Sequence, residues 1–293
     1  MFGVLLAVAA AFTIALQAVF IRLGTDKGNS RGVLVVVLAT NIAVLVPIAF
    51  VVGYPRPYYG LTPLSFGAFV GAGIVGTLFG RSLFYESIER VGASRAEPVK
   101  ASQPLHAAAV AVVVLGEALT AVHLLGILLI VAGVGFVSWT IRDGGTAPPR
   151  TLLLPLAAAF FFGVEPVFAS IGLSEGTPVV VGLAVKTAAA SAGFAVYLRW
   201  KDTLDTTAFR SPSRRWYLLA AAANVAFLIL YYTALTVSDV VVVVPIVQTS
   251  PLFVVVLSAL FLRDLEKVDA RVFAGALLVV IGAAIVTATG VTP

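Results

Sequence analysis

The chain repeats itself, and this internal repeat constrains the fold more than any other feature of the sequence. The segment Leu83–Leu115 returns 147 positions later as Leu230–Leu262. Two prolines and an acid keep this register, since Pro98 matches Pro245, Pro104 matches Pro251 and Glu117 matches Asp264. After an insertion of two residues in the second copy, Gly126 matches Gly275 and Gly133 matches Gly282. A register held over this length indicates that the chain is a duplication.

The composition places both copies in a membrane. Sixty per cent of the residues are hydrophobic and only 11% are charged, whereas a soluble domain carries roughly 25% charged residues. The mean hydropathy is +1.06. At about 20 residues for each membrane-spanning helix, 293 residues accommodate ten helices with short connections. We therefore expect an all-α membrane protein.

The apolar runs predict where these helices lie. Ten runs follow one another, at residues 1–23, 32–53, 63–88, 94–115, 122–141, 152–173, 178–200, 215–236, 239–262 and 270–289. The first and sixth runs also match, since Gln17–Phe20 falls on Glu165–Phe168 at an offset of 148. The stretch 142–150 is rich in glycine and proline, as linkers are. We expect one repeat at residues 1–143 and a second at 151–293, each with five helices.

An odd number of helices in each repeat makes the second copy enter the membrane from the opposite side, so the repeats are inverted. The distribution of Lys and Arg supports this. In the first copy, Arg56 is the only Lys or Arg residue in the loops after the second and fourth helices. Their counterparts in the second copy are rich in basic residues: Arg199, Lys201, Arg210, Arg214, Arg215, Arg263, Lys267 and Arg271. Because basic loops stay in the cytoplasm, the odd-numbered connections are predicted to be cytoplasmic and both termini to be outside.

Several spaced motifs resemble a known family. The block LFYESIERVGAS followed by QPL before the fourth helix has a twin in YYTAL followed by TSPL, and the two close on LGEAL and LRDLE. This pattern is similar to the two EamA-type repeats of the drug/metabolite transporter superfamily. The resemblance implies a ten-helix secondary transporter with a central pocket for small metabolites such as amino acids, often moved outward. It also implies cytoplasmic termini, opposite to the loop charges.

The polar residues inside the predicted helices are the candidates for substrate binding, because charge at membrane depth is costly and usually faces a cavity or a partner. Three cations, Arg81, Lys100 and Lys186, stand against three acids, Glu86, Glu97 and Glu165. We therefore expect each deep cation to have an acid available. The residues predicted to bind substrate are these charged residues except Glu86, together with amide residues and tyrosines. They are Glu97, Lys100, Glu165, Lys186, Arg81, Gln17, Gln103, Asn41, Tyr85, Tyr232 and Gln248.

Helical spacing refines this set. Glu97 and Lys100 share a helix face and lie near two prolines, which free backbone carbonyls that line cavities. Glu165 precedes a mid-helix proline, and broken helices point to transporter sites. Lys186 lies about 12 Å from the start of its helix. Glu165 lies on a helix that enters the membrane from the opposite side, so the two residues are expected at a similar depth. A purely structural Glu97–Lys100 pair is an alternative, as are simple packing roles for His106, Tyr85 and Tyr232, and helix caps for Glu117 and Asp264.

These residues favour a transporter over an enzyme. The chain has no cysteine and only two histidines, and it contains neither a metal-binding HExxH motif nor a phosphate-binding loop. No cofactor is expected, and the basic loops do not call for a nucleic acid. The expected partners are a small-molecule substrate and the lipid bilayer of the plasma membrane, with proton coupling and a monomer or homodimer left open. Balanced deep charges favour a zwitterion such as an amino acid as the substrate, and the family resemblance implies that it is often moved outward. Export of lipophilic cations and a non-alternating channel or scaffold are the alternatives.

Overall fold

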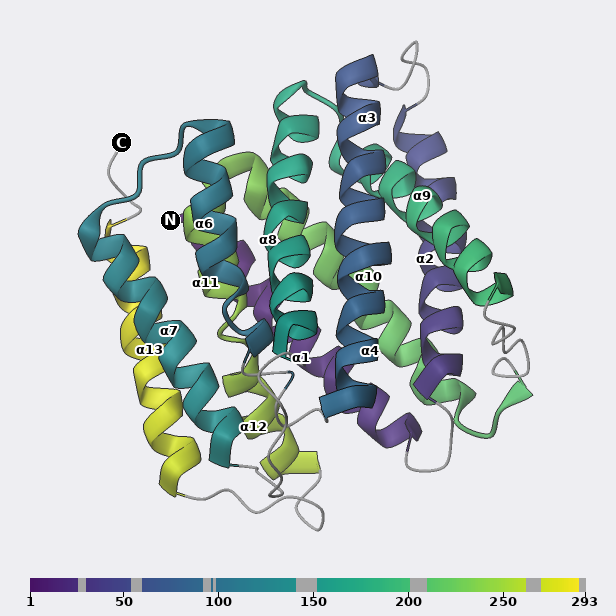
Figure 1. The fold of residues 1–293 in the computed structure, drawn as a ribbon. Helices are drawn as coiled ribbons and strands as arrows, with labels where there is room; N and C mark the ends of the chain where they lie inside the picture. The colour runs from purple at the N-terminus through teal and green to yellow at the C-terminus, as the bar shows by residue number, and fades with distance from the viewer. Residues whose placement is uncertain are drawn as a thin grey trace.

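The computed structural model describes residues 1–25, 30–53, 60–91, 96, 99–140, 152–200, 210–261 and 270–289. Within these ranges the chain is a bundle of helices without strands (Figure 1). Six of the described helices are long and apolar enough to cross a membrane by length and composition alone, and four shorter apolar helices stand beside them.

The helices of the first repeat form five spans. They are α1 (Phe2–Thr25), α2 (Ser30–Gly53), a span built of α3 (Pro63–Ala72), η2 (Gly73–Gly80) and α4 (Arg81–Val91), then α6 (Gln103–Leu115) and α7 (Ala121–Thr140). The segment η2 is a π-helix, which the sequence analysis did not predict.

The second repeat follows the same order. Its spans are α8 (Leu153–Ser174), α9 (Val179–Trp200), α10 (Arg214–Val237), a span built of α11 (Val240–Val247) and α12 (Ser250–Phe261), and α13 (Ala270–Thr289). The ten predicted helices are confirmed, with boundaries within a few residues for most of them.

The fourth and ninth spans were each predicted as one helix, with prolines disturbing the backbone hydrogen bonds of the fourth, and both are interrupted at equivalent positions. The chain turns at Ser102 before α6 and at Thr249 between α11 and α12. In each turn the side-chain hydroxyl donates to the carbonyl three residues earlier, at 2.7 Å. Pro104 and Pro251 each follow two residues after the turn residue, and each lacks the N–H that a continuous helix would use.

Two glycines on each of α7 and α13 reveal how the copies are related. These helices lie side by side (Figure 1). A Cβ on Gly126 would come within 2.9 Å of the Gly282 carbonyl oxygen, and one on Gly133 within 2.7 Å of that of Gly275. In sequence, Gly126 matches Gly275 and Gly133 matches Gly282, so the contacts exchange equivalent residues, as a two-fold axis does. Since the two helices are antiparallel, the axis is perpendicular to them, and the repeats are inverted.

The two repeats interleave instead of folding side by side. Helix α1 packs along α10 and against α11 and α12 of the second repeat. Its counterpart α8 packs along α3, η2 and α4 and against α6 of the first repeat. The fold is thus an all-α membrane protein of ten helices in two inverted repeats, and the middle of α8 lies against the π-helix.

Candidate functional site

A buried ion pair lies at the middle of the second repeat. The Lys186 ammonium on α9 donates to Glu165 Oε1 on α8 at 2.6 Å, and the Tyr232 hydroxyl on α10 donates to the same oxygen at 2.6 Å. Tyr232 is fully buried, while Lys186 and Glu165 are 6% and 9% exposed. The Lys186 ammonium also lies 4.7 Å from the centre of the Tyr232 ring, within the range of a cation–π contact. Three helices therefore converge on one carboxylate.

Glycines of the π-helix bring the first repeat onto this pair. A Cβ on Gly76 would come within 2.3 Å of the Glu165 side chain, and one on Gly73 within 2.4 Å of the Lys186 carbonyl oxygen. Real Cβ atoms do not approach so closely, so only glycine allows η2 to lie against both helices. The pair is thus enclosed between second-repeat helices and a first-repeat helix.

Tyr232 is held in place by an aromatic neighbour. Its ring stacks on Phe69 of α3, with centroids 6.5 Å apart and planes at 28°. Phe69 is fully buried and lies against Gly172 and Gly182, where a Cβ would come within 2.7 and 2.3 Å of its ring. This packing orients the tyrosine hydroxyl towards Glu165.

The position equivalent to Glu165 in the first repeat carries a neutral network. Asn41 Nδ2 donates to Asn224 Oδ1 at 2.8 Å, and Asn224 Nδ2 donates to Gln17 Oε1 at 3.0 Å. All three side chains are buried, joining α1, α2 and α10. Gln17 matches Glu165 in sequence, so the two-fold axis relates a neutral amide cluster to a charged pair. The two halves are equivalent in fold and different in electrostatics.

Gln103, predicted to bind substrate, makes a structural hydrogen bond. Its Nε2 donates to the Phe162 carbonyl at 3.2 Å. In a regular helix that carbonyl would accept the N–H of residue 166, but Pro166 has none. Gln103 thereby satisfies the acceptor that the proline frees and joins α6 to α8.

Lys100 lies apart from the buried pair, near the turn before α6. Its ammonium is 4.6 Å from the centre of the Phe84 ring and 6.0 Å from that of Phe162. Glu97, its predicted partner, lies outside the described residues, as does the side chain of Tyr85.

Two further residues that were predicted to bind substrate, Gln248 and Arg81, lie at helix ends. Gln248 ends α11, where its backbone N–H donates to the Val244 carbonyl at 3.2 Å. Arg81 is the first residue of α4, directly after the π-helix. The structure thus brings Glu165, Lys186 and Tyr232 together and gathers Gln17 and Asn41 in a second cluster.

Glu117 connects the repeats at one face of the molecule. Both carboxylate oxygens accept backbone N–H groups at the start of α11, Val240 to Oε1 and Val241 to Oε2, each at 2.9 Å. A helix cap at Glu117 was one interpretation of the sequence, and this residue caps a helix of the opposite repeat. Its counterpart Asp264 lies outside the described residues.

A second set of bonds closes the same face, which carries the connections α2–α3, α6–α7, α8–α9 and α10–α11 at the top of Figure 1. We call it the even face. Thr62 Oγ1 donates to Glu175 Oε2 at 2.9 Å, and Thr177 Oγ1 donates to the Gly60 carbonyl at 2.8 Å. Each bond joins one repeat to the other, so these contacts tie the two repeats together at the even face, and we interpret this arrangement as its closed state.

Removing the Glu117 carboxylate is expected to loosen the even face. A helix cap contributes about 0.5–2 kcal/mol, so Glu117→Ala should raise the opening equilibrium by about two- to thirtyfold. Because the chain has no cysteine, Val244→Cys in α11 gives a single buried reporter. Its labelling rate with a hydrophilic maleimide should rise in Glu117→Ala and stay unchanged in Glu86→Ala, a surface control on α4. Equal rates in both variants would show that Glu117 does not hold this face closed.

The same residue predicts a pH response. Burial raises the pKa of Glu117 above its usual value and outweighs the two backbone N–H groups, which lower it, while Asp239 raises it further. The closed face therefore binds this proton more tightly than an open face, where Glu117 meets water. Acidification through the raised pKa should stabilise closure and slow labelling at Val244→Cys by more than the falling thiolate fraction alone does. Glu117→Gln should abolish this additional slowing; additional slowing that persists would assign it to another group.

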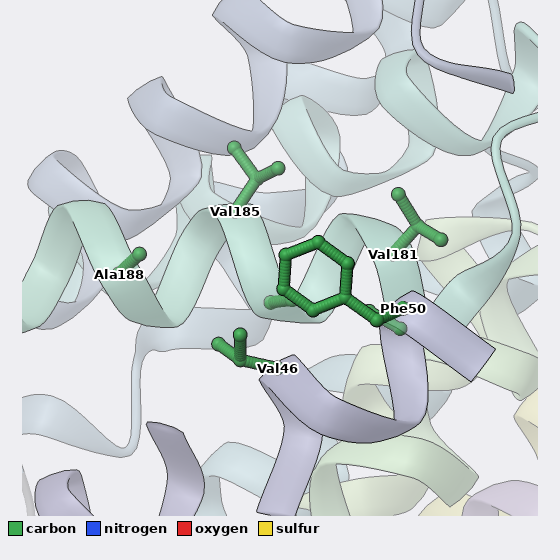
Figure 2. A pocket seen from close by; sticks show the side chains of 7 residues that line it. Val46, Phe50, Val181, Val185 and Ala188 are labelled. Carbon is green, nitrogen blue, oxygen red and sulfur yellow. The ribbon is translucent and has the colours of Figure 1, made fainter. Parts of the chain in front are cut away.

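An apolar groove of about 230 Å³ runs between α2 and α9. Figure 2 shows Val46 and Phe50 from α2 facing Val181, Val185 and Ala188 from α9. All of its lining side chains are hydrocarbon, so it offers no partner to a charged substrate. Among the described residues, no group of three His, Cys, Asp or Glu side chains is placed to hold a metal ion.

Comparison with known proteins agrees with the fold. A crystal structure described only as "Crystal structure of protein" superposes with a TM-score of 0.79, covering 98% of this chain and 97% of its own, at 16% identity. At that identity the likeness concerns the fold alone. No curated protein matches the chain. The model of the EamA-like transporter family matches residues 1–139 and 149–288, nearly the whole length in two copies. The chain belongs to the EamA-like transporter family.

Proposed function

We propose that this membrane transporter of small molecules exports a zwitterionic metabolite, an amino acid or a close relative, across the plasma membrane. Membership of the family supports transport and argues against an enzyme. The substrate class and the direction are our inference from the charged site and the loop charges. We also propose that the repeats extend over residues 1–143 and 151–293.

The observation that carries the proposal is the compensated pair at the middle of the bundle. Glu165 is neutralised by Lys186 within hydrogen-bonding distance, so the pair itself carries no net charge. A ligand with both charges can replace each partner's counterion without leaving a buried charge unpaired. A ligand with a single charge would leave one buried charge unpaired.

The phenylalanines near Glu165 favour a zwitterion over a lipophilic cation. Such a cation would need an uncompensated acid among aromatic rings, and the run Phe160–Phe162 lies close to Glu165 in the sequence. These rings are engaged elsewhere: Phe160 lies edge-on to His106, Phe161 contacts Phe79, and Phe162 contacts Phe84. The carboxylate instead faces the tyrosine hydroxyl and the lysine.

The closed even face supports a transport cycle. The Glu117 cap and the bonds between Thr62, Glu175, Thr177 and Gly60 hold this face shut. Because each of them joins the two repeats, a rocking motion of one repeat against the other would break them together. We place the even face outside on the basis of the loop charges, opposite to the side that the family resemblance implies, so its opening is the release step in the proposed exporter.

A ligand screen on the purified protein tests the proposed substrate class. A ligand at 100 times its Kd stabilises the folded state by about 2.7 kcal/mol. At least one of the twenty L-amino acids should raise the thermal midpoint at millimolar concentration, while tetraphenylphosphonium and tetraethylammonium should not. Stabilisation by these cations and by no amino acid would contradict the proposal.

A further inference from the structure

Each deep cation was expected to have an acid available, but Arg81, in the transmembrane region, has none in the part of the chain that the structure describes. It is partly buried within the span that begins at Pro63. Among the residues that the structure describes, it makes neither an ion pair nor a hydrogen bond. Glu86, on the same helix, pairs instead with Arg90 at the surface. The equivalent residue of the second repeat is Leu228, which is buried, so the fold does not require a cation here.

The π-helix places Arg81 on the side of the ion pair. Gly76 touches Glu165, and Arg81 follows five residues later. In an α-helix, residues five apart point about 140° away from each other, at 3.6 residues per turn. A π-helix bonds residue i to i+5, which brings positions five apart close to the same face. Arg81 is also near enough to Lys186 for their charges to interact.

The Glu165 carboxylate has one oxygen available. Lys186 and Tyr232 both donate to Oε1, and no described residue donates to Oε2. The side chain of Glu165 retains 11% of its exposure. The site therefore holds an acceptor without a donor and, on the neighbouring span, a guanidinium without an acceptor.

We propose that Arg81 binds the carboxylate of the substrate while Glu165 Oε2 accepts its ammonium, so that an α-amino acid enters the site in one orientation. The inference rests on the proposed function and adds the groups that select the substrate. Arginine suits this role because its planar guanidinium binds a carboxylate through two parallel hydrogen bonds. An amine without a carboxylate would leave Arg81 unpaired, and the site would reject it.

Substitution of Arg81 tests this inference through ligand discrimination. For each L-amino acid that stabilises the wild-type protein, affinity is measured alongside that of its amide, which keeps the ammonium and lacks the carboxylate. The wild type should prefer the amino acid by at least tenfold. Arg81→Gln should lose that preference, with weaker binding of the amino acid and unchanged or tighter binding of the amide. Arg90→Gln, a surface substitution on the same helix, should bind as the wild type does.

Folding is not expected to complicate the result, since Arg81 leaves no described partner unpaired when it is removed. The thermal midpoint of ligand-free Arg81→Gln, measured beside that of Arg90→Gln, checks this, and Arg81→Lys offers a second variant that keeps the charge and loses the bidentate geometry. Arg81→Lys should show an intermediate preference. A wild-type preference that survives unchanged in Arg81→Gln and Arg81→Lys overturns the role of Arg81 alone. Failure of every amino acid to bind the wild type overturns the proposed function as well.

Discussion

Replacing Glu165 by glutamine is expected to abolish transport and to lower the stability of the protein. The carboxylate accepts both Lys186 and Tyr232 in a buried site. Breaking a buried ion pair by removing one partner costs about 3–5 kcal/mol, because the other charge is left without compensation. Transport should fall to background in proteoliposomes, and the thermal midpoint should drop in the same preparation.

A double variant separates the two effects. Glu165→Gln with Lys186→Met removes both charges, so it should recover much of the stability that Glu165→Gln loses. It should still be inactive, because neither charge is available to the substrate. Normal transport by either variant would place the substrate site elsewhere.

Alanine at Gly133 is expected to destabilise the fold through the contact of α7 with α13. The new Cβ would lie 2.7 Å from the Gly275 carbonyl oxygen and 2.6 Å from the Val279 side chain, so the two helices would have to separate. Overpacking of this kind costs about 1–3 kcal/mol. Unfolding of the detergent-solubilised protein should shift to lower temperature or denaturant concentration.

Gly135 provides the matched control two residues along the same helix. A Cβ there meets no atom within 4 Å, and alanine favours a helix over glycine by roughly 0.5–1 kcal/mol. Gly135→Ala should therefore be neutral or stabilising. Equal destabilisation by both substitutions would mean that helix packing at the two-fold axis is not the cause.

Run length and internal repetition were sufficient to predict the architecture. Hydropathy located ten spans, and the matched glycines on α7 and α13 proved to be the residues that cross at the two-fold axis. These features are visible in sequence because burial in lipid demands long apolar runs, and a duplicated chain conserves its own register.

Hydrogen-bonding patterns within the spans were not predictable in the same way. Apolar runs have the same appearance in an α-helix and a π-helix, so η2 escaped notice, although Gly73, Gly76 and Gly80 gave a signal in retrospect. The prolines near Ser102 and Thr249 indicated disturbed helices but not where the turns lie. Both features depend on the neighbouring helices, which a linear pattern does not contain.

Tertiary partners were the other limit of the sequence. Depth alone suggested that Glu165 and Lys186 reach the same level, but their contact and the role of the Tyr232 hydroxyl required the packed structure. Glu117 was expected to cap a helix, yet its partner lies in the opposite repeat. Gln103 was expected to bind substrate, and its bond to the carbonyl freed by Pro166 became visible only when α6 and α8 were placed together.

Counterflow in proteoliposomes shows whether amino acids are transported through the Glu165–Lys186 site. Vesicles loaded with an unlabelled amino acid that stabilises the purified protein are diluted into a trace of the same labelled amino acid. We expect transient accumulation of label in wild-type vesicles and none with the Glu165→Gln, Lys186→Met double variant, reconstituted at equal amount. Accumulation at the wild-type rate by the double variant would place the substrate site elsewhere, and absence of accumulation in wild-type vesicles for every amino acid would rule out amino-acid transport.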